Sequence, residues 1–339
     1  MNDDIVIAAS DRYGWPQLRN WVLSLADTGF GGRVVIVAYR IDEDTVGRLS
    51  EHGVEIVRAS SDHLSRPIDY RSWERRALVP NRLRRLWKLV LGTDVPHIGH
   101  NAVFHFRFFH YWQFLATTNH ADAYVVASDV SDVVFQKNPS IWLRNNAAPF
   151  KLISSSESLR HCDEPWNCET FSRCYGSPIL NRVLRDRLVS NAGVVAGEAA
   201  FVRDLFLNVY LMTFASAFSN SDQAAMNLLL SLEPNRSEVR VTTSHDAWAC
   251  QAGTTADPRK IVSFRPHLRD PEPYFRDGLV YNAAGTKYCI VHQYNRVPEW
   301  KLVIDARYAA RDREGLSVPK NDQPRNSSGV NIAARIALV

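Results

Sequence analysis

Two aspartates, Asp129 and Asp132, have the residue type and spacing best suited to chemistry in this chain. They follow the run 123–128 (AYVVAS), whose length and β-branched content are typical of a buried central strand. Open α/β folds bind ligands at the carboxyl edge of the sheet, where these two carboxylates would lie. Magnesium and manganese prefer a few carboxylate oxygens together with phosphate oxygens. The segment 128–139 (SDVSDVVFQKNP) therefore predicts a hard-cation site that can bridge a diphosphate, whereas the simpler alternative is a pair of turn or cap residues.

Four further residues could serve the same site, and each also has a purely structural explanation. His292 follows an apolar pair, but a lone histidine is more often buried and satisfied by its neighbours. Asp222 suits the positive end of a helix. Gly193 could allow a positive φ in a hairpin, and Arg107 could extend from an aromatic helix to water. Single residues therefore leave both interpretations open.

The hydrophobic pattern of the N-terminal region predicts alternating strands and helices. The predicted order is strand, helix, strand, helix, strand, at 5–9, 16–28, 34–39, 43–52 and 54–57. This alternation predicts an α/β fold with a Rossmann-like, mostly parallel central sheet flanked by helices. Glycines at 29–32 precede a strand, so they do not form the dinucleotide fingerprint, which follows a strand and opens a helix.

Later segments continue this pattern. Helices are predicted at 101–117, 198–217 and 221–232, with Ser221 as the N-cap of the last one, and strands at 279–281 and 288–292. The segment 188–197 (LVSNAGVVAG) predicts a strand, a glycine turn and a second strand. From Arg313 onward the chain turns polar, which indicates a tail with little fixed structure.

Composition and charge exclude several classes of function. The 339 residues include 40 Lys and Arg against 36 Asp and Glu, and a formal net charge of +4 is too mild for a dedicated nucleic-acid binder. Five cysteines without C-x-x-C spacing are expected to be free thiols. The opening residues (MNDDIVIAAS) lack the pattern of a signal peptide, and no window has the apolar length of a membrane span, so we expect a cytoplasmic location.

A basic helix is predicted at 71–91. Leu83, Leu86, Trp87 and Val90 would form its apolar face, with arginines and lysines on the others. The simpler interpretation is a solvated helix face. The alternative is contact of Arg71 to Lys88 with an anionic acceptor or with membrane headgroups.

The segment 128–139 resembles the acidic metal motif of glycosyltransferases with the nucleotide-diphosphosugar transferase fold, the A-type fold. Three later motifs are similar to those of such enzymes: SNAG at 190–193 with Gly197 to the sugar-pocket loop, Asp222–Gln223 with Asn227 to a DQ-x-x-x-N helix start, and VHQYNR at 291–296 to a late strand with a metal-site histidine. The resemblance spans roughly residues 4–300. It implies a single fused nucleotide and acceptor unit of the A-type fold.

The resemblance also implies a metal site and a sugar pocket. Asp129, Asp132 and His292 would hold Mn²⁺ or Mg²⁺. The commonest form of the motif is D-x-D, so the extra residue here leaves open which carboxylate binds the ion directly. Asn191 and Gln223 would hydrogen-bond the hydroxyls of the donor sugar, with Gly193 in the pocket loop. Asp222 would lie near the anomeric carbon.

Two further contacts with the donor follow from the same resemblance. Arg107 would face the sugar or the diphosphate from its helix. The end of the first strand, Ala9 with Asp11 and Tyr13, would take the nucleoside, because that edge borders the same crevice.

The implied reaction is metal-dependent transfer of a sugar from a nucleotide-diphosphate sugar to a hydroxyl acceptor in glycan or polysaccharide assembly, with retention favoured over inversion. Residues 1–140 would form the nucleotide-sugar half with the metal motif, 141–312 the donor-sugar and acceptor half, and 313–339 a flexible tail. Acceptor specificity is expected in loops such as 157–177, where Trp166 and Tyr175 could stack on a sugar or pack. The oligomeric state is not readable.

Alternative functions are distinguishable. A sugar nucleotidyltransferase normally needs a Gly-rich loop after the first strand, whereas ASDRYGWP has one glycine. A non-catalytic carbohydrate- or membrane-binding protein would use the basic helix and the many aromatic residues but would have no need of a metal beside a diphosphate. A metal-dependent nuclease is disfavoured by the mild charge.

Overall fold

The computed structural model describes residues 3–59, 102–118, 122–214 and 221–316. The strands in these ranges are β1 (Ile5–Asp11), β2 (Arg33–Tyr39), β3 (Glu55–Arg58), β4 (Tyr124–Ser128), β5 (Val133–Phe135), β6 (Leu152–Arg160), β7 (Leu188–Glu198), β8 (Val239–Thr242), β9 (Ala249–Gln251), β10 (Tyr274–Arg276), β11 (Leu279–Tyr281) and β12 (Ile290–His292). The helices are α1 (Trp15–Asp27), α2 (Glu43–Glu51), α5 (Ala102–Thr117), α6 (Pro139–Asn146), α7 (Pro165–Tyr175), α8 (Ser177–Ile179), α9 (Ala199–Phe214), α10 (Asp222–Leu230), α11 (Asn235–Glu238), α12 (Ala252–Thr255), α13 (Ile261–Phe264) and α14 (Pro298–Leu316).

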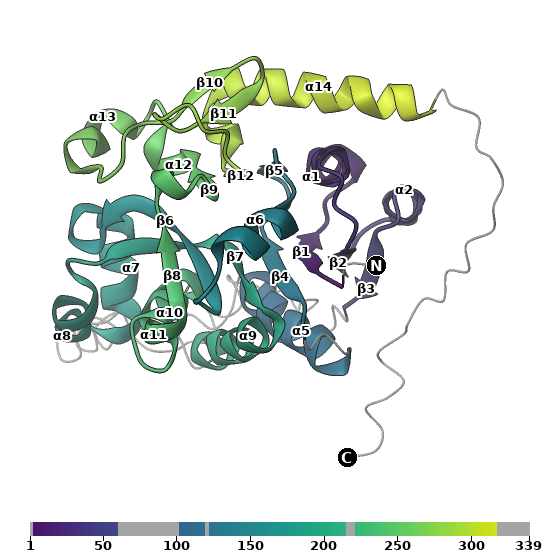
Figure 1. Cartoon of the computed structure of the whole chain (residues 1–339). Helices are drawn as coiled ribbons and strands as arrows, with labels where there is room; N and C mark the ends of the chain where they lie inside the picture. The colour runs from purple at the N-terminus through teal and green to yellow at the C-terminus, as the bar shows by residue number, and fades with distance from the viewer. Residues whose placement is uncertain (1–2, 60–101, 119–121, 215–220, 317–339) are drawn as a thin grey trace, which may run out of the picture.

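Seven of the described strands form a central sheet in the order β3-β2-β1-β4-β7-β6-β8 (Figure 1). All neighbouring pairs are parallel except the two that β7 makes, with β4 and with β6. The predicted α/β fold with a mostly parallel sheet flanked by helices is therefore confirmed. Strands from both sides of residue 140 share this one sheet, because β4 lies beside β7.

Helices cover both faces of the sheet, and the alternation of side chains along β1 explains how. Val6 and Ala8 lie in a core cluster with the apolar face of α1. Ile5 and Ile7 point the other way, into a cluster with α5 and α9. Because successive strand residues face opposite sides, one continuous apolar strand supplies both cores. Figure 1 shows α5 and α9 together on one side of the sheet and α1 on the other.

A three-stranded sheet, β5-β12-β9, lies beside the central one. β12 pairs with β5 in antiparallel and with β9 in parallel orientation. The four residues 129–132 join β4 of the central sheet to β5 of the small one. The segment with the two aspartates is thus the connection between the two sheets.

Most predicted elements are present. The five N-terminal elements, the helix at 102–117, the buried strand at 124–128 and the helix that starts at 222 match the prediction. The late strands at 279–281 and 290–292 do as well. The Ser221 hydroxyl, however, makes no capping hydrogen bond, and it lies 3.3 Å from His105 Nε2 instead.

Three predictions of local structure are wrong. The segment 188–197 is one continuous strand, β7, and Gly193 has no positive φ. Backbone pairing to β4 on one side and β6 on the other keeps it extended. The expected acceptor loop at 157–177 consists of the end of β6 and the helix α7. The helix α14 continues to Leu316, so the polar tail does not begin at 313.

The remaining predictions concern the cellular location, the membrane contact of the basic helix and the state of the cysteines. The basic helix from Arg71 to Lys88 and the tail beyond 316 lie outside the described residues. Within the described ranges no helix has both the length and the apolar character that a membrane crossing requires. The cytoplasmic location and the membrane contact stay predictions. The five cysteines all lie in described ranges, and none of them forms a disulfide.

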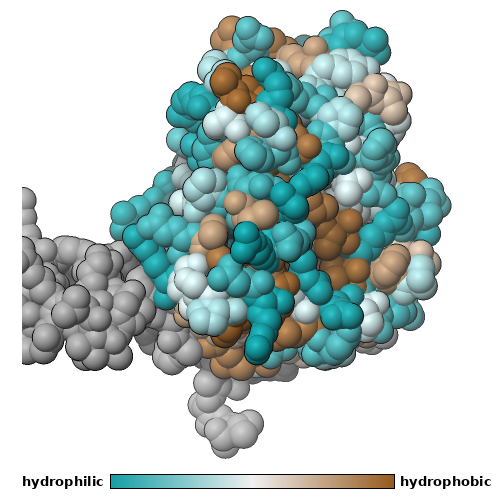
Figure 2. Space-filling view, turned by 90° about the vertical axis from the view of Figure 1, so that its left-hand side faces the viewer, coloured by the Kyte–Doolittle hydropathy of each residue, from teal (hydrophilic) through white to brown (hydrophobic). Residues whose placement is uncertain are grey.

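One face of the molecule carries scattered hydrophobic residues. Figure 2 shows them among hydrophilic residues on the side where Figure 1 places α7, α8 and α13. These helices include the exposed side chains of Trp166, Ile179 and Val262. Tyr175 instead packs against Phe171 inside a small core cluster. Scattered apolar side chains are normal on a surface, so they indicate no docking site by themselves.

Candidate functional site

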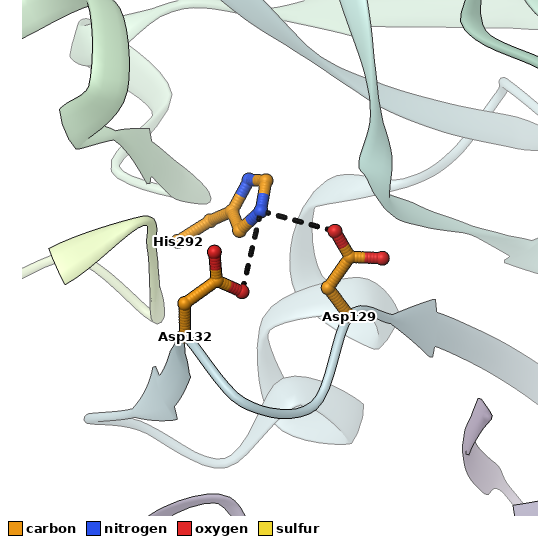
Figure 3. Close-up of side chains that lie close together, drawn as sticks. All are labelled: Asp129, Asp132 and His292. Carbon is orange, nitrogen blue, oxygen red and sulfur yellow. Dashed lines mark ion pairs between the residues drawn. The ribbon is translucent and has the colours of Figure 1, made fainter. Parts of the chain in front are cut away.

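Asp129, Asp132 and His292 converge at the junction of the two sheets (Figure 3). His292 Nε2 lies 3.4 Å from Asp129 Oδ2 and 3.7 Å from Asp132 Oδ1. One ligand atom from each residue lies within 4.8 Å of the others. The three residues that the sequence suggested as metal ligands therefore share one place, although 160 residues separate Asp132 from His292.

Strand register explains this convergence. In the antiparallel pair of β12 and β5, His292 is the partner of Val133, the residue after Asp132. The backbone N–H of Gln293 donates to the Asp132 carbonyl (2.7 Å), which fixes the turn against the end of β12. The N–H of Asp129 donates to the Gly193 carbonyl (2.8 Å) and so joins the turn to β7. The ligand geometry is thus a product of sheet pairing.

The donor set fits a divalent cation. His292 is 2 % exposed, and its Nε2 is buried without a hydrogen-bond partner while it faces two carboxylates. Buried polar atoms are nearly always satisfied, so an orphaned imidazole nitrogen at this position favours a missing ligand. Two carboxylate oxygens and one imidazole suit Mn²⁺ or Mg²⁺, with remaining positions for substrate oxygens.

The charges of the trio influence one another. Burial lowers the pKa of His292, but Asp132 and Asp129 outweigh burial and raise it above its usual value. Burial disfavours ionised Asp129, yet Arg107 and His292 hold its pKa well below the usual range. Burial dominates at Asp132 and raises its pKa. Ionised Asp132 is therefore unfavourable in the protein alone, and a bound cation would stabilise its negative charge.

Arg107 forms a buried double ion pair. Its guanidinium donates to Asp129 Oδ1 at 2.5 Å and to Asp222 Oδ2 at 2.9 Å. The ring faces of Phe104 and Phe108 flank it. Arg107 thus ties the metal turn to the start of α10. Both carboxylates neutralise the charge of Arg107 within the protein, so its side chain does not extend to water.

Glycine is required at position 193 because the backbone of β7 passes close to the ring of His292. A Cβ atom at this position would lie 2.3 Å from Cε1 and 2.7 Å from Nε2 of His292. No real side chain tolerates such contacts, so β7 can pass over the imidazole only with glycine here. The sequence reasoning placed Gly193 in the sugar-pocket loop, whereas the structure places it directly against His292.

Gly193→Ala is expected to weaken Mn²⁺ binding about tenfold or more, because the new methyl group must displace the His292 ring. Overpacking should also cost about 1–3 kcal/mol of stability. Titration with Mn²⁺ by isothermal calorimetry measures the first effect. Gly47→Ala is the matched control, since Gly47 lies in α2 with nothing within 4 Å of its added Cβ. Equal Mn²⁺ affinity in both variants would contradict this account of Gly193.

A buried network of amides surrounds Glu157, a residue that the sequence reasoning missed. Glu157 Oε1 accepts from Asn191 Nδ2 (2.8 Å) and from Gln223 Nε2 (3.0 Å). Gln223 Nε2 also donates to Asn167, and its oxygen accepts from the N–H of Ala192. Burial raises the pKa of Glu157. A lone acid in the run LISSSESL, which otherwise holds only serines and aliphatic residues, was the signal that could have found it.

The two amides assigned to the sugar are thus already engaged. The Asn191 oxygen accepts from the Gly193 N–H (2.7 Å), and both N–H bonds of Gln223 have protein acceptors. Asn191 and Gln223 lie beside the metal trio, with Glu157 between them. Their first role in this structure is to join β7 to β6 and α10 through buried hydrogen bonds with Glu157.

Asn227 holds α10 against β7. Its side chain accepts from the Ser190 N–H (2.8 Å) and donates to the Ser190 carbonyl (2.8 Å), as a neighbouring strand would. Its oxygen also lies 3.1 Å from His161 Nε2. The spacing from Asp222 to Asn227 therefore places one end of α10 at Arg107 and the next turn at β7.

Stability is expected to fall as pH drops from 6.5 to about 4, in part because of His161. Burial lowers the pKa of His161 from 6.5 to about 4, so in this range the unfolded chain takes up a proton that the folded protein does not. Above pH 6.5 both states are neutral and the penalty is absent. The difference amounts to about 3 kcal/mol.

The control for this effect is His161→Phe, which cannot titrate. Urea unfolding of both proteins at several pH values gives their free energies of unfolding. Between pH 6.5 and about 4 this free energy should fall more steeply for the wild type than for the variant, because only the wild type pays the protonation penalty. The same pH dependence of the free energy of unfolding in both proteins would contradict this role of His161. The buried and unpartnered Nδ1 of His161 explains the penalty, since the imidazolium would need a second acceptor there.

The predicted nucleoside edge lies next to the trio. Ala8 is the register partner of Ser128, so Ala9 lies at the level of Asp129 on the neighbouring strand. Asp11 is paired with Arg40 through two hydrogen bonds of 2.7 and 2.5 Å. Tyr13 is 38 % exposed just beyond β1. These positions are compatible with a ligand that extends from the trio along the sheet edge.

The fold is that of the A-type glycosyltransferases. Solved structures match it over nearly the whole chain, whereas no family model and no curated protein sequence matches. One match is the galactosyltransferase LgtC in complex with donor and acceptor sugar analogs, with a TM-score of 0.51, 12 % identity and coverage of 93 % of this chain and 98 % of that one. An active-site mutant of LgtC gives a TM-score of 0.52 at 11 % identity, with the same coverage.

A third match is mouse xyloside xylosyltransferase 1, with a TM-score of 0.48, 10 % identity and coverage of 86 % of this chain and 97 % of that one. Identities this low establish the shared fold alone. The site must therefore be argued from the residues of this chain.

Proposed function

We propose that this chain is a metal-dependent glycosyltransferase that moves a sugar from a nucleotide-diphosphate sugar to a hydroxyl acceptor. The observation that carries the proposal is the convergence of two carboxylates and an orphaned imidazole at the sheet junction of an A-type fold. A non-catalytic carbohydrate-binding protein has no need for a metal beside a diphosphate.

Asp129 Oδ2, Asp132 Oδ1 and His292 Nε2 would hold Mn²⁺ or Mg²⁺. The bound ion would act as a Lewis acid and template for the diphosphate leaving group. Asp129 uses its other oxygen to accept from Arg107, so its carboxylate is held in one orientation. This arrangement leaves Oδ2 for the ion.

The remaining residues position the donor. Arg107 and the Glu157 network fix Asp222, Asn191 and Gln223 before any substrate arrives, which reduces reorganisation during the reaction. Asp222 would lie near the anomeric carbon, and the two amides would line the sugar subsite. Ala9, Asp11 and Tyr13 would border the nucleoside.

Finer assignments rest on the sequence resemblance. They are retention of configuration, a role in glycan or polysaccharide assembly, and the division into a nucleotide-sugar half (1–140) and a donor-sugar and acceptor half (141–312). A retaining enzyme needs no separate base, because the departing phosphate can take the acceptor proton.

A binding screen tests the proposal. Thermal unfolding is followed with a panel of nucleoside diphosphates, each with and without Mn²⁺. The cognate nucleotide should raise the melting temperature by a few degrees only when Mn²⁺ is present, because ligands that bind the folded state stabilise it by mass action. Incubation of the protein with the matching nucleotide sugar and Mn²⁺ should then release the nucleoside diphosphate slowly, with water taking the place of the acceptor hydroxyl and receiving the sugar. Failure of every nucleotide to stabilise the protein would contradict the proposal.

A further inference from the structure

Gln251 lies directly behind the imidazole of His292. It ends β9, and it is the register partner of His292 in the parallel pair of β9 and β12. Its amide oxygen is 2.6 Å from His292 Nδ1. Both side chains are 2 % exposed, so no water competes for this contact.

The hydrogen bond determines the tautomer of the imidazole. An amide oxygen only accepts, so His292 Nδ1 must carry the proton that it donates to Gln251. A neutral ring protonated at Nδ1 has its lone pair on Nε2, the nitrogen that faces Asp129 and Asp132. The lone pair therefore points to the place where the cation of the proposed function would lie.

Ser155 fixes the amide in turn. Gln251 Nε2 donates to Ser155 Oγ at 2.5 Å, and Ser155 is fully buried in β6. With its nitrogen held by Ser155, the amide presents its oxygen to the histidine. A strand of the central sheet thus holds in place a side chain at the end of the small sheet.

We propose that Gln251 is the positioning residue of the metal site, held by Ser155, and that it prepares His292 Nε2 to bind the cation. The inference rests on the proposed function, because it concerns the ion of that site. Partners of this kind typically change metal affinity by about 10–100-fold when they are removed. Gln251 itself contacts neither the ion nor the substrate.

The test is a Mn²⁺ titration followed by electron paramagnetic resonance, on full-length protein with no nucleotide. Gln251→Leu keeps the volume but removes the acceptor, so its dissociation constant for Mn²⁺ should rise about tenfold or more. Gln251→Glu keeps an acceptor for Nδ1–H and should restore an affinity close to that of the wild type. Ser155→Ala should give a smaller loss, since it frees the amide without removing it.

Gln136→Leu is the matched control. Gln136 directly follows β5, and its side chain hydrogen-bonds the backbone of Val280 and Tyr288. Its substitution removes hydrogen bonds of the same kind away from the imidazole, so it should lower the melting temperature without changing Mn²⁺ affinity. A purely structural role of Gln251 would make Gln251→Leu behave like this control, which would overturn the inference.

A second measurement needs no substitution of Gln251 and decides the matter if Gln251→Leu does not fold. In metal-free protein labelled with ¹⁵N-histidine, at an alkaline pH where the ring is neutral, the resonances of His292, assigned by comparison with His292→Asn, should show the proton on Nδ1. A proton on Nε2 would overturn the inference. Absence of Mn²⁺ binding by the wild type would instead defeat the proposed function, so the two failures are distinguishable.

Discussion

Asp132→Asn is expected to lower kcat/KM for sugar transfer about a thousandfold or more, because it removes one of two anionic ligands of the ion. A bound cation contributes several kcal/mol to stabilisation of the leaving group, and each 1.4 kcal/mol corresponds to about a factor of ten. The substitution preserves shape and does not touch the Arg107 ion pairs. Burial raises the pKa of Asp132, which means that its charge is costly in the folded protein. The variant should therefore be at least as stable as the metal-free wild type.

The measurement pairs steady-state kinetics at saturating Mn²⁺ with thermal unfolding in chelator. Asp204→Asn is the control, because Asp204 lies on α9 in an exposed pair with Arg203. Asp204→Asn should leave both kcat/KM and the melting temperature unchanged. Wild-type turnover by Asp132→Asn in chelator would show that the reaction does not depend on this carboxylate.

Arg107→Met is expected to reduce the free energy of unfolding by about 3–5 kcal/mol, the usual consequence of removing one partner of a buried ion pair. The side chains of Arg107 and Asp222 are each only 10 % exposed, so the carboxylate of Asp222 would lose a cation that water cannot replace, whereas water can reach Asp129, whose side chain is 31 % exposed. Activity should also fall where the variant is still folded, because the turn and α10 lose their common anchor. Urea unfolding measures the loss of stability, and steady-state kinetics of the folded variant measure the loss of activity.

A double variant separates this ion pair from general packing. In Arg107→Met with Asp222→Asn, one unpaired carboxylate is removed, so part of the lost stability should return. Coupled neighbours typically show interaction energies of about 0.5–3 kcal/mol in such cycles. Strict additivity of the two substitutions would contradict the pairing seen in the structure.

The sequence predicted the fold well where its signals were local. Short apolar runs and a period-3.6 helical pattern defined the N-terminal elements, and the apolar run before Asp129 defined β4. The meeting of Asp129, Asp132 and His292 was also predicted, but from motif resemblance, since no local pattern connects positions so far apart. The register between β12 and β5 is its physical cause.

Features that depend on strand pairing could not be predicted. The segment 188–197 has the glycines of a hairpin, yet its insertion between β4 and β6 keeps it extended, and Gly193 is needed for the approach of His292. Gln251 and Glu157 acquire their roles only through partners on other strands. A single sequence contains no signal for such pairs.

The most direct test of the metal trio is a crystal of the protein grown with Mn²⁺ and measured for anomalous scattering. A peak between Asp129, Asp132 and His292, with ligand distances near 2.2 Å as is usual for such ions, is the predicted result. Absence of a peak there at saturating Mn²⁺, or a peak only elsewhere, would contradict the account.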